Sequence, residues 1–187
     1  MSPTLPMKTA TLSRDRLCAQ PDGAVAVTPA APTLVIHPGD VVCVNEGTAV
    51  QTLLGSCVAI CMVDVAHTVG AMCHYVHCAS PRPGHHKDAT FAEVAMQRMF
   101  AELRSRGVDP LACEAYVCGG GAMRLQGLEG APSVGSRNVV WARQFLLAQG
   151  VLAHEVSVGG GACYRKVHWR VGQGAPVVRV LPIEESR

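Results

Sequence analysis

The chain has 187 residues, of which 49% are hydrophobic and 16% are charged, and its formal net charge is +2. This composition fits one folded domain and excludes a disordered chain, because disordered segments combine low hydrophobicity with high charge. The low net charge and the small aromatic share of 4% argue against nucleic-acid binding, which needs clustered cations and stacking surfaces. No apolar run reaches the roughly 18 residues of a membrane span, so we expect no membrane insertion.

Residues 1–33 are interrupted by five prolines and show no sustained hydrophobic period. We therefore expect a flexible leader over 1–33, a folded domain over 34–183 and a frayed tail over 184–187. The leader holds no apolar run long enough for a signal peptide, which predicts a cytoplasmic protein. The nine cysteines are an odd number in a chain that is large enough to fold without disulfides, so we expect mostly reduced thiols.

The first apolar runs predict strands. Residues 34–36 and 41–44 flank the turn signal Pro38-Gly39-Asp40, which predicts that these two strands pair with each other. Residues 58–65 and 71–78 form two further apolar runs around a polar break at 67–70, which predicts two buried strands joined by a turn. A loop with two prolines and a glycine is expected over 79–88.

The hydrophobic period then changes to that of a helix. Thr90 and Glu93 have the spacing of a capping box, apolar residues recur at helical spacing from Phe91 to Leu103, and Gly107 stands at the expected C-terminal cap. A second helix is predicted over about 136–149, with Gly150 after it. Residues 115–118 form a short apolar run that predicts a strand between the two helices.

The C-terminal part is predicted to be strands at 151–158, 164–171 and 177–181, separated by glycine-rich turns. The three-glycine stretches at 119–121 and 159–161 lack the Gly-x-Gly-x-x-Gly and Gly-Lys-Ser/Thr patterns of nucleotide sites, so we interpret them as tight turns. The expected fold is a single mixed α/β domain with two main helices and more strands than helices.

One cysteine stands out by its neighbours. In the stretch 52–57, Gly55 and Ser56 expose the backbone immediately before Cys57, which begins an apolar strand. Small neighbours let a carbonyl group approach the sulfur, and nearby backbone amides can face a developing oxyanion. The alternative interpretation of Cys57 is a buried, inert thiol, since free cysteines are among the most buried residues.

His74 strengthens the catalytic interpretation. If the strands 58–65 and 71–78 pair, His74 can lie beside Cys57, take the thiol proton and lower the pKa of the thiol. The alternative is a core histidine bonded to a backbone carbonyl. Arg137-Asn138, at the start of the second helix, leaves two interpretations open: an anion site or groove, or hydrogen bonds of the helix start.

Metal binding is the competing chemistry. The segment from Cys73 to Cys78 holds two cysteines and two histidines, which are good zinc ligands. On a strand, however, Cys73 and His77 face one side while His74 and Cys78 face the other, and no Cys-x-x-Cys spacing is present. We therefore expect no metal, and we interpret His85-His86 as a solvated surface pair.

These motifs, in order and spacing, resemble those of the bacterial CheD family of chemoreceptor glutamine deamidases over roughly residues 34–181. The residues that carry the resemblance are Leu54-Gly55-Ser56-Cys57-Val58-Ala59, Asp64, Gly70 to His74, Gly119-Gly120-Gly121-Ala122-Met123, Val134-Gly135-Ser136-Arg137-Asn138, and Gly160-Gly161 followed by Arg165. The most specific of them is the Leu-Gly-Ser-Cys-Val block with a histidine 17 residues after its cysteine.

The resemblance implies a mixed-sheet α/β sandwich with a papain-like Cys/His site and no cofactor. It implies hydrolysis of glutamine side chains to glutamate in methyl-accepting chemotaxis receptors, with release of ammonia through a Cys thioester. Cys57 would be the nucleophile, His74 the general base and acid, and Gly55 and Ser56 would shape the oxyanion site. A threonine that orients the histidine would be Thr52, with Gln51 as the alternative position.

The resemblance also implies a partner, a CheC-type phosphatase that competes with the receptors. Hydrolysis of methyl esters at the same receptor positions is a related possibility, because a thioester route accepts either leaving group. The alternative to an enzyme is a non-catalytic module that binds a receptor or the phosphatase. The pair of Cys57 and His74 distinguishes the two, since a binding module needs neither.

Overall fold

The computed structural model describes residues 33–81, 83–123 and 132–183. The predicted leader, except Thr33, and the predicted tail lie outside these residues. Two sheets and two α-helices make up the described part. The strands of the first sheet, in spatial order, are β1 (Thr33–Val35), β3 (Ala49–Leu54), β8 (Cys163–Arg170) and β9 (Val177–Pro182). Those of the second are β2 (Val41–Asn45), β5 (Val69–Tyr75), β4 (Val58–Val63), β6 (Glu114–Gly119) and β7 (Leu152–Val158).

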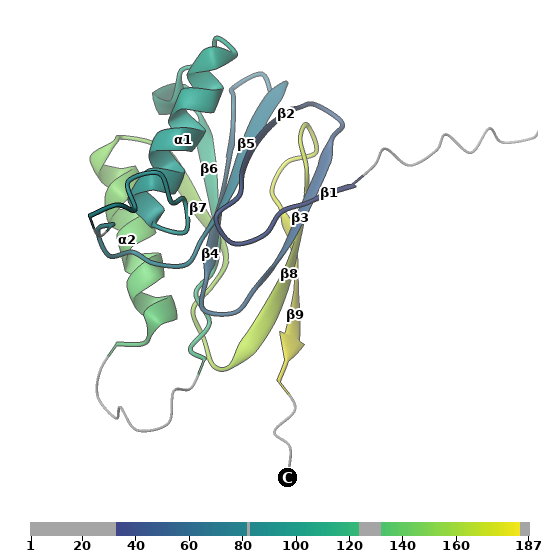
Figure 1. Cartoon of the computed structure of the whole chain (residues 1–187). Coiled ribbons are helices and arrows are strands. Elements are labelled where there is room, and N and C mark those ends of the chain that lie inside the picture. The colour runs from purple at the N-terminus through teal and green to yellow at the C-terminus, as the bar shows by residue number, and fades with distance from the viewer. Residues whose placement is uncertain (1–32, 82, 124–131, 184–187) are drawn as a thin grey trace, which may run out of the picture. The chain divides into compact units, whose positions relative to one another are not determined.

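The elements of the domain are stacked in three layers (Figure 1). Helices α1 (Ala92–Ser105) and α2 (Val134–Ala148) cover one face of the five-stranded sheet, and the four-stranded sheet lies against its other face. One apolar cluster fills the space between the helices and the five-stranded sheet, and a second fills the space between the sheets. The predicted mixed α/β sandwich with two main helices is confirmed.

The central strands lie where the hydrophobic runs of the sequence predict them. Every residue of β4 is buried, as expected of a strand that is covered on both faces. β4 and β5 pair antiparallel, with Ala59 opposite His74. The predicted strands at 115–118, 151–158, 164–171 and 177–181 correspond to β6, β7, β8 and β9. β3 was not predicted.

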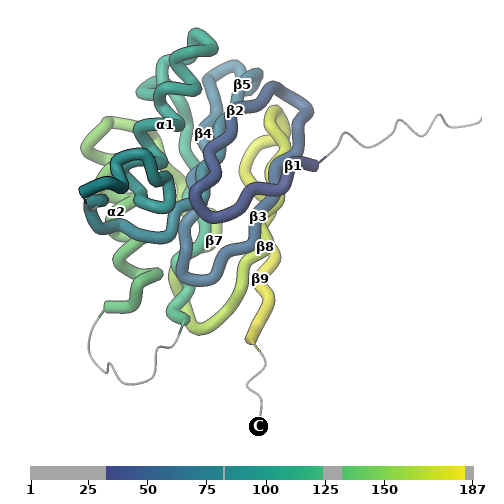
Figure 2. Tube along the Cα trace, viewed as in Figure 1, coloured from purple at the N-terminus to yellow at the C-terminus, as the bar shows by residue number. Residues whose placement is uncertain are grey.

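The predicted pairing of residues 34–36 with residues 41–44 is wrong. β1 pairs with β3, whereas β2 pairs with β5 in the other sheet, so the chain crosses between the sheets at the Pro38-Gly39 turn (Figure 2). This crossing segment is bonded to both sheets: Ile36 N–H donates to the carbonyl of Gln51 at 2.9 Å, and Gly39 N–H donates to that of His74 at 2.8 Å. Backbone bonds to both sheets replace those of the hairpin that the turn signal predicted.

The predicted capping box of α1 is also wrong. The N-cap is Phe91, which makes no side-chain bond, and the Thr90 hydroxyl donates to Asp88 at 2.7 Å instead. A short 3₁₀-helix (Pro110–Ala112) follows α1. α2 begins two residues earlier than predicted, because Ser133 caps it by accepting from the N–H of Ser136 at 3.0 Å.

Candidate active site

His74 lies on β5 and faces the space between the two sheets. It follows Met72 at the two-residue period of a strand, and Met72 belongs to the cluster between the sheets. The side chain is only 1% exposed, and its Nε2 has no hydrogen-bond partner among the described residues. A buried imidazole nitrogen without a partner is costly in a structural histidine. The core-histidine interpretation, a ring held by a backbone carbonyl, therefore does not account for this nitrogen.

Thr52, from the opposite sheet, holds the other ring nitrogen. Its Oγ1 lies 2.9 Å from His74 Nδ1 and donates its single proton to the carbonyl of Ile36 at 2.8 Å. Since that proton is committed to Ile36, the oxygen can only accept from Nδ1–H. The ring proton is thereby assigned to Nδ1, and Nε2 is left with a free lone pair.

Cys57 comes to the same space from the start of β4. It packs against the cluster between the sheets and lies two residues before Ala59, which is the cross-strand partner of His74. Because Val58 pairs with Tyr75, Cys57 immediately precedes the ladder and lies diagonally from His74 on the face of Ala59. Diagonal neighbours of this kind are within reach of an aromatic side chain. The structure therefore brings three predicted site residues, Thr52, Cys57 and His74, to one place between the sheets.

The protonation states of the pair differ from the prediction. Burial lowers the pKa of His74 to about 4, against an opposing effect of Asp40. Burial likewise raises the pKa of the Cys57 thiol, and a hydrogen bond from its own backbone N–H opposes part of that rise. Both shifts favour a neutral thiol beside a neutral imidazole, so the expected lowering of the thiol pKa is not found.

The turn before β4 is held through three consecutive carbonyls. Gly121 N–H donates to Gly55 O at 2.9 Å, and Gly120 N–H donates to Cys57 O at 2.8 Å. The carbonyl between them, that of Ser56, accepts from the side chain of Asn138 at 3.1 Å. All three peptide groups of the turn are therefore fixed in direction.

At two of the glycines opposite this turn, Gly119 and Gly120, a side chain would not fit. Gly119 and Gly120 have φ of +112° and +72°, which side chains disfavour. A Cβ atom at Gly119 would lie 2.3 Å from Cys57 O, and one at Gly120 would lie 2.2 Å from Val139. The first three-glycine stretch is thus a close backbone contact with the cysteine turn. It ends β6 and forms no tight turn, and the expected positive φ is found at Gly119 and Gly120.

Comparison with known proteins adds an independent line of evidence. A family model described as CheD chemotactic sensory transduction matches residues 78–180. A Geobacter sulfurreducens protein, named probable chemoreceptor glutamine deamidase CheD 2, is 35% identical over 132 residues, covering 71% of this chain and 80% of the relative. A Chromobacterium violaceum protein, named probable chemoreceptor glutamine deamidase CheD 1, is 31% identical over 159 residues, covering 83% and 81%.

The chain belongs to the CheD family. The matched segment of the CheD model begins at Cys78, after Thr52, Cys57 and His74. Within the described part of this CheD chain, no helix is both long and apolar enough to cross a membrane.

The other candidate residues of this CheD protein are the remaining cysteines, the pair His85-His86 and Gln51. The eight described cysteines are unpaired thiols, and no group of three or more His, Cys, Asp and Glu side chains that could hold a metal ion is found among residues 33–81, 83–123 and 132–183. His85 and His86 are both exposed, as expected of a solvated pair, and His85 lies 3.6 Å from Asp88. Gln51 lies on β3 next to Thr52, and Thr52 is the residue that meets His74.

Sequence reasoning did not foresee the place of Asn138. Its side chain is fully buried and bonds to the turn that carries Cys57, whereas the sequence left an anion site and a helix-start arrangement as open alternatives. A signal was present, because a polar residue on the apolar face of a predicted helix needs partners in the core.

Proposed function

We propose that this chain is a protein-glutamine deamidase that hydrolyses glutamine side chains of methyl-accepting chemotaxis receptors to glutamate. The relatives' names include this activity. The observation that carries the proposal is the hydrogen-bond chain from Ile36 through Thr52 to His74, which leaves the Nε2 lone pair free. A free lone pair on a buried imidazole beside a cysteine is what a general base requires.

In the first step, His74 Nε2 takes the thiol proton while Cys57 Sγ attacks the carboxamide carbon of glutamine. Because the resting pair is neutral, proton transfer accompanies the attack. The C–N bond then breaks as His74 gives the proton to the leaving nitrogen. The products of this half-reaction are ammonia and a thioester between Cys57 and the former glutamine side chain.

The oxyanion of this step needs fixed donors. In a trans peptide the N–H points opposite to the preceding carbonyl, so bonds to the carbonyls of Gly55 and Ser56 orient the N–H groups of Ser56 and Cys57. These two amides make no backbone bond outside the regular elements among the described residues. They are our candidates for the oxyanion site, for which the resemblance implied Gly55 and Ser56.

In the second step, water attacks the thioester, with His74 Nε2 again as base. The C–S bond breaks, the thiol regains its proton and glutamate is released, so the sum is glutamine plus water to glutamate plus ammonia. No cofactor or metal enters this sequence. A methyl ester at the same receptor position would react by the same steps and release methanol.

The proposed substrates place the reaction in the cytoplasm, at the cytoplasmic part of the receptors. A CheC-type phosphatase that competes with receptors for this chain is part of the same proposal. The product carboxylates add negative charge to a receptor helix, and like charges on neighbouring helical positions repel.

The direct test incubates the purified chain with cytoplasmic receptor fragments and follows ammonia release, with mass spectrometry of the fragments. Conversion of glutamine to glutamate raises the mass of the peptide by about 1 Da, and Cys57→Ala is the matched control. Receptor binding without any conversion would favour the second candidate, a non-catalytic module that binds a receptor or the phosphatase.

A further inference from the structure

Asn138 connects the two strands that carry the site. Its Nδ2 donates to the carbonyl of Ser56 at 3.1 Å and to the carbonyl of Val76 at 2.8 Å. Ser56 immediately precedes Cys57, and Val76 follows His74 by two residues. One amide group from α2 therefore spans the start of β4 and the end of β5.

The burial of Asn138 is costly to stability, which indicates that the residue has another role. Asn138 is 0% exposed, and its Oδ1 has no partner among the described residues. Two carbonyl acceptors fix the amide orientation, because only the NH₂ end can donate to both. An unpartnered buried oxygen destabilises the fold, so a residue kept only for stability would not be expected to leave one.

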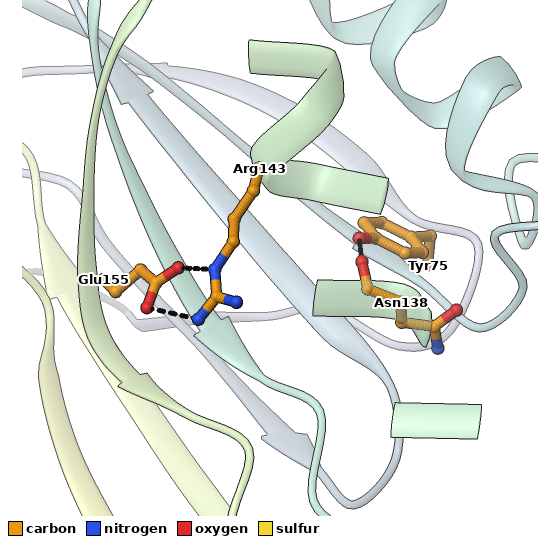
Figure 3. Close-up of polar contacts among 4 residues, drawn as sticks. All are labelled: Tyr75, Asn138, Arg143 and Glu155. Atoms are coloured by element: carbon orange, nitrogen blue, oxygen red, sulfur yellow. Dashed lines mark hydrogen bonds and ion pairs between the residues drawn. The ribbon is translucent and has the colours of Figure 1, made fainter. Parts of the chain in front are cut away.

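Residue 138 is also fixed at its backbone. The hydroxyl of Tyr75, the neighbour of His74, donates to the Asn138 carbonyl at 2.8 Å (Figure 3). The Tyr75 bond anchors the backbone of the helix to β5, whereas the two side-chain bonds of Asn138 hold the carbonyls of Ser56 and Val76. Arg143, five residues further along α2, forms an exposed ion pair with Glu155 of β7 through two hydrogen bonds (Figure 3).

We infer that Asn138 is a positioning residue of the deamidase site, which sets the distance between Cys57 and His74 and aims the N–H of Cys57 at the oxyanion. This inference rests on the proposed function. The bond to Ser56 O fixes the peptide plane whose N–H belongs to Cys57. The bond to Val76 O fixes the end of the strand that carries His74.

The test compares three variants of the full chain with receptor fragments as substrate. Asn138→Ala is expected to lower kcat by roughly ten- to a hundred-fold with KM changed less than about twofold, since misplacement by 1 Å costs about a hundredfold in rate. Tyr75→Phe is the matched control, because it removes a buried hydrogen bond to the same residue and leaves both side-chain bonds of Asn138 in place. Its kcat is expected to stay within about threefold of that of the wild type.

Asn138→Asp separates positioning from packing, since it keeps the shape of the side chain and loses the donors. A buried carboxyl is protonated more readily than one in water, and only its protonated form can donate to a carbonyl. The ratio of variant to wild-type kcat is therefore expected to rise as pH is lowered from 8 to 5.5. If Asn138→Ala does not fold, this isosteric variant carries the test alone.

The outcomes are distinct. An active wild type together with unchanged kcat in Asn138→Ala, or with a pH-independent ratio in Asn138→Asp, would overturn the inference and leave the proposed function standing. A kcat loss in Tyr75→Phe equal to that in Asn138→Ala would reduce Asn138 to a stability role. A folded wild type that releases no ammonia would overturn the proposed function, and this inference with it.

Discussion

The two sheets of the sandwich differ in how many of their faces are covered. The five-stranded sheet lies between the helices and the other sheet, and its strand β4 is buried at every position. The four-stranded sheet covers its neighbour with one face only, so β8 alternates between buried and accessible side chains. His74 belongs to the first sheet and Thr52 to the second. Burial in the covered sheet lowers the pKa of the His74 imidazole, and Thr52 of the half-covered sheet orients the ring.

The largest expected effect comes from Cys57, which immediately precedes β4 of the covered sheet. Cys57→Ala should lower ammonia release by more than about a thousandfold, because it removes the attacking sulfur. Thermal unfolding should show a folded protein, since Cys57 is only partly buried. Wild-type rates in this variant would refute a covalent route.

Thr52 tests the contribution of the half-covered sheet. Thr52→Ala should lower kcat roughly ten- to a hundred-fold, because one hydrogen bond to a charged imidazolium is worth about 1.5–3 kcal/mol and each 1.4 kcal/mol is tenfold in rate. Thr52→Ser should retain most of the activity, since it keeps the hydroxyl. Gln51→Ala, on the other face of β3, is the control, and a crippled Gln51→Ala beside a normal Thr52→Ala would transfer the orienting role to Gln51.

The pH dependence of the rate tests the burial that the covered sheet provides. The pKa of His74 lies near 4, below its usual 6.5, so the unprotonated base persists down to about pH 5. We expect kcat/KM to be level from pH 6 to 8 and to fall about tenfold per pH unit only below about 4. A fall centred near pH 6.5 would mean that solvent reaches the imidazole, and circular dichroism at each pH would exclude unfolding as its cause.

The smallest expected effect concerns the contact between the sheets. A Cβ atom at Gly70 of β5 would lie 2.5 Å from Trp169 and 2.6 Å from Val171. Gly70→Ala should lower the free energy of unfolding by about 1–3 kcal/mol, as overpacked cores do. Gly161→Ala meets nothing within 4 Å and is the control for denaturant titration. Equal stability of the two variants would mean that the sheets separate easily at this point.

Whether a sheet is covered on one face or on both also decides what the sequence could predict. The runs at 58–65 and 71–78 correctly predicted two buried strands, because a strand that is buried on both faces has a continuous apolar sequence. Their ends differ by up to three residues from those of β4 (Val58–Val63) and β5 (Val69–Tyr75). The partner of residues 34–36 was wrongly predicted, because a turn signal describes local geometry and carries no information about which sheet receives the next strand. β3 was missed for a related reason: its residues alternate only weakly, and its pairing with β8 joins residues far apart in the sequence.

The candidate site was predictable as a set of residue types and less so as an arrangement. Cys57 and His74 follow from the Leu-Gly-Ser-Cys-Val block and the spacing of two strands. The carbonyl of Ile36 that takes the Thr52 proton belongs to the crossing segment, and the amide of Asn138 belongs to a helix 82 residues away from Ser56. Such contacts depend on tertiary structure and leave no local pattern.

The neutral state of the Cys57 thiol and the His74 imidazole protects the sulfur in a cell that contains oxidants. Peroxides and alkylating metabolites react with thiolates, and a thiol that keeps its proton is a poor target for them. Burial raises the pKa of Cys57, and Thr52, a neutral residue, takes the orienting position where a carboxylate would favour the charged imidazolium. Under the proposed mechanism the sulfur is therefore unreactive between turnovers, and it becomes a nucleophile only when His74 takes its proton during attack on a bound amide.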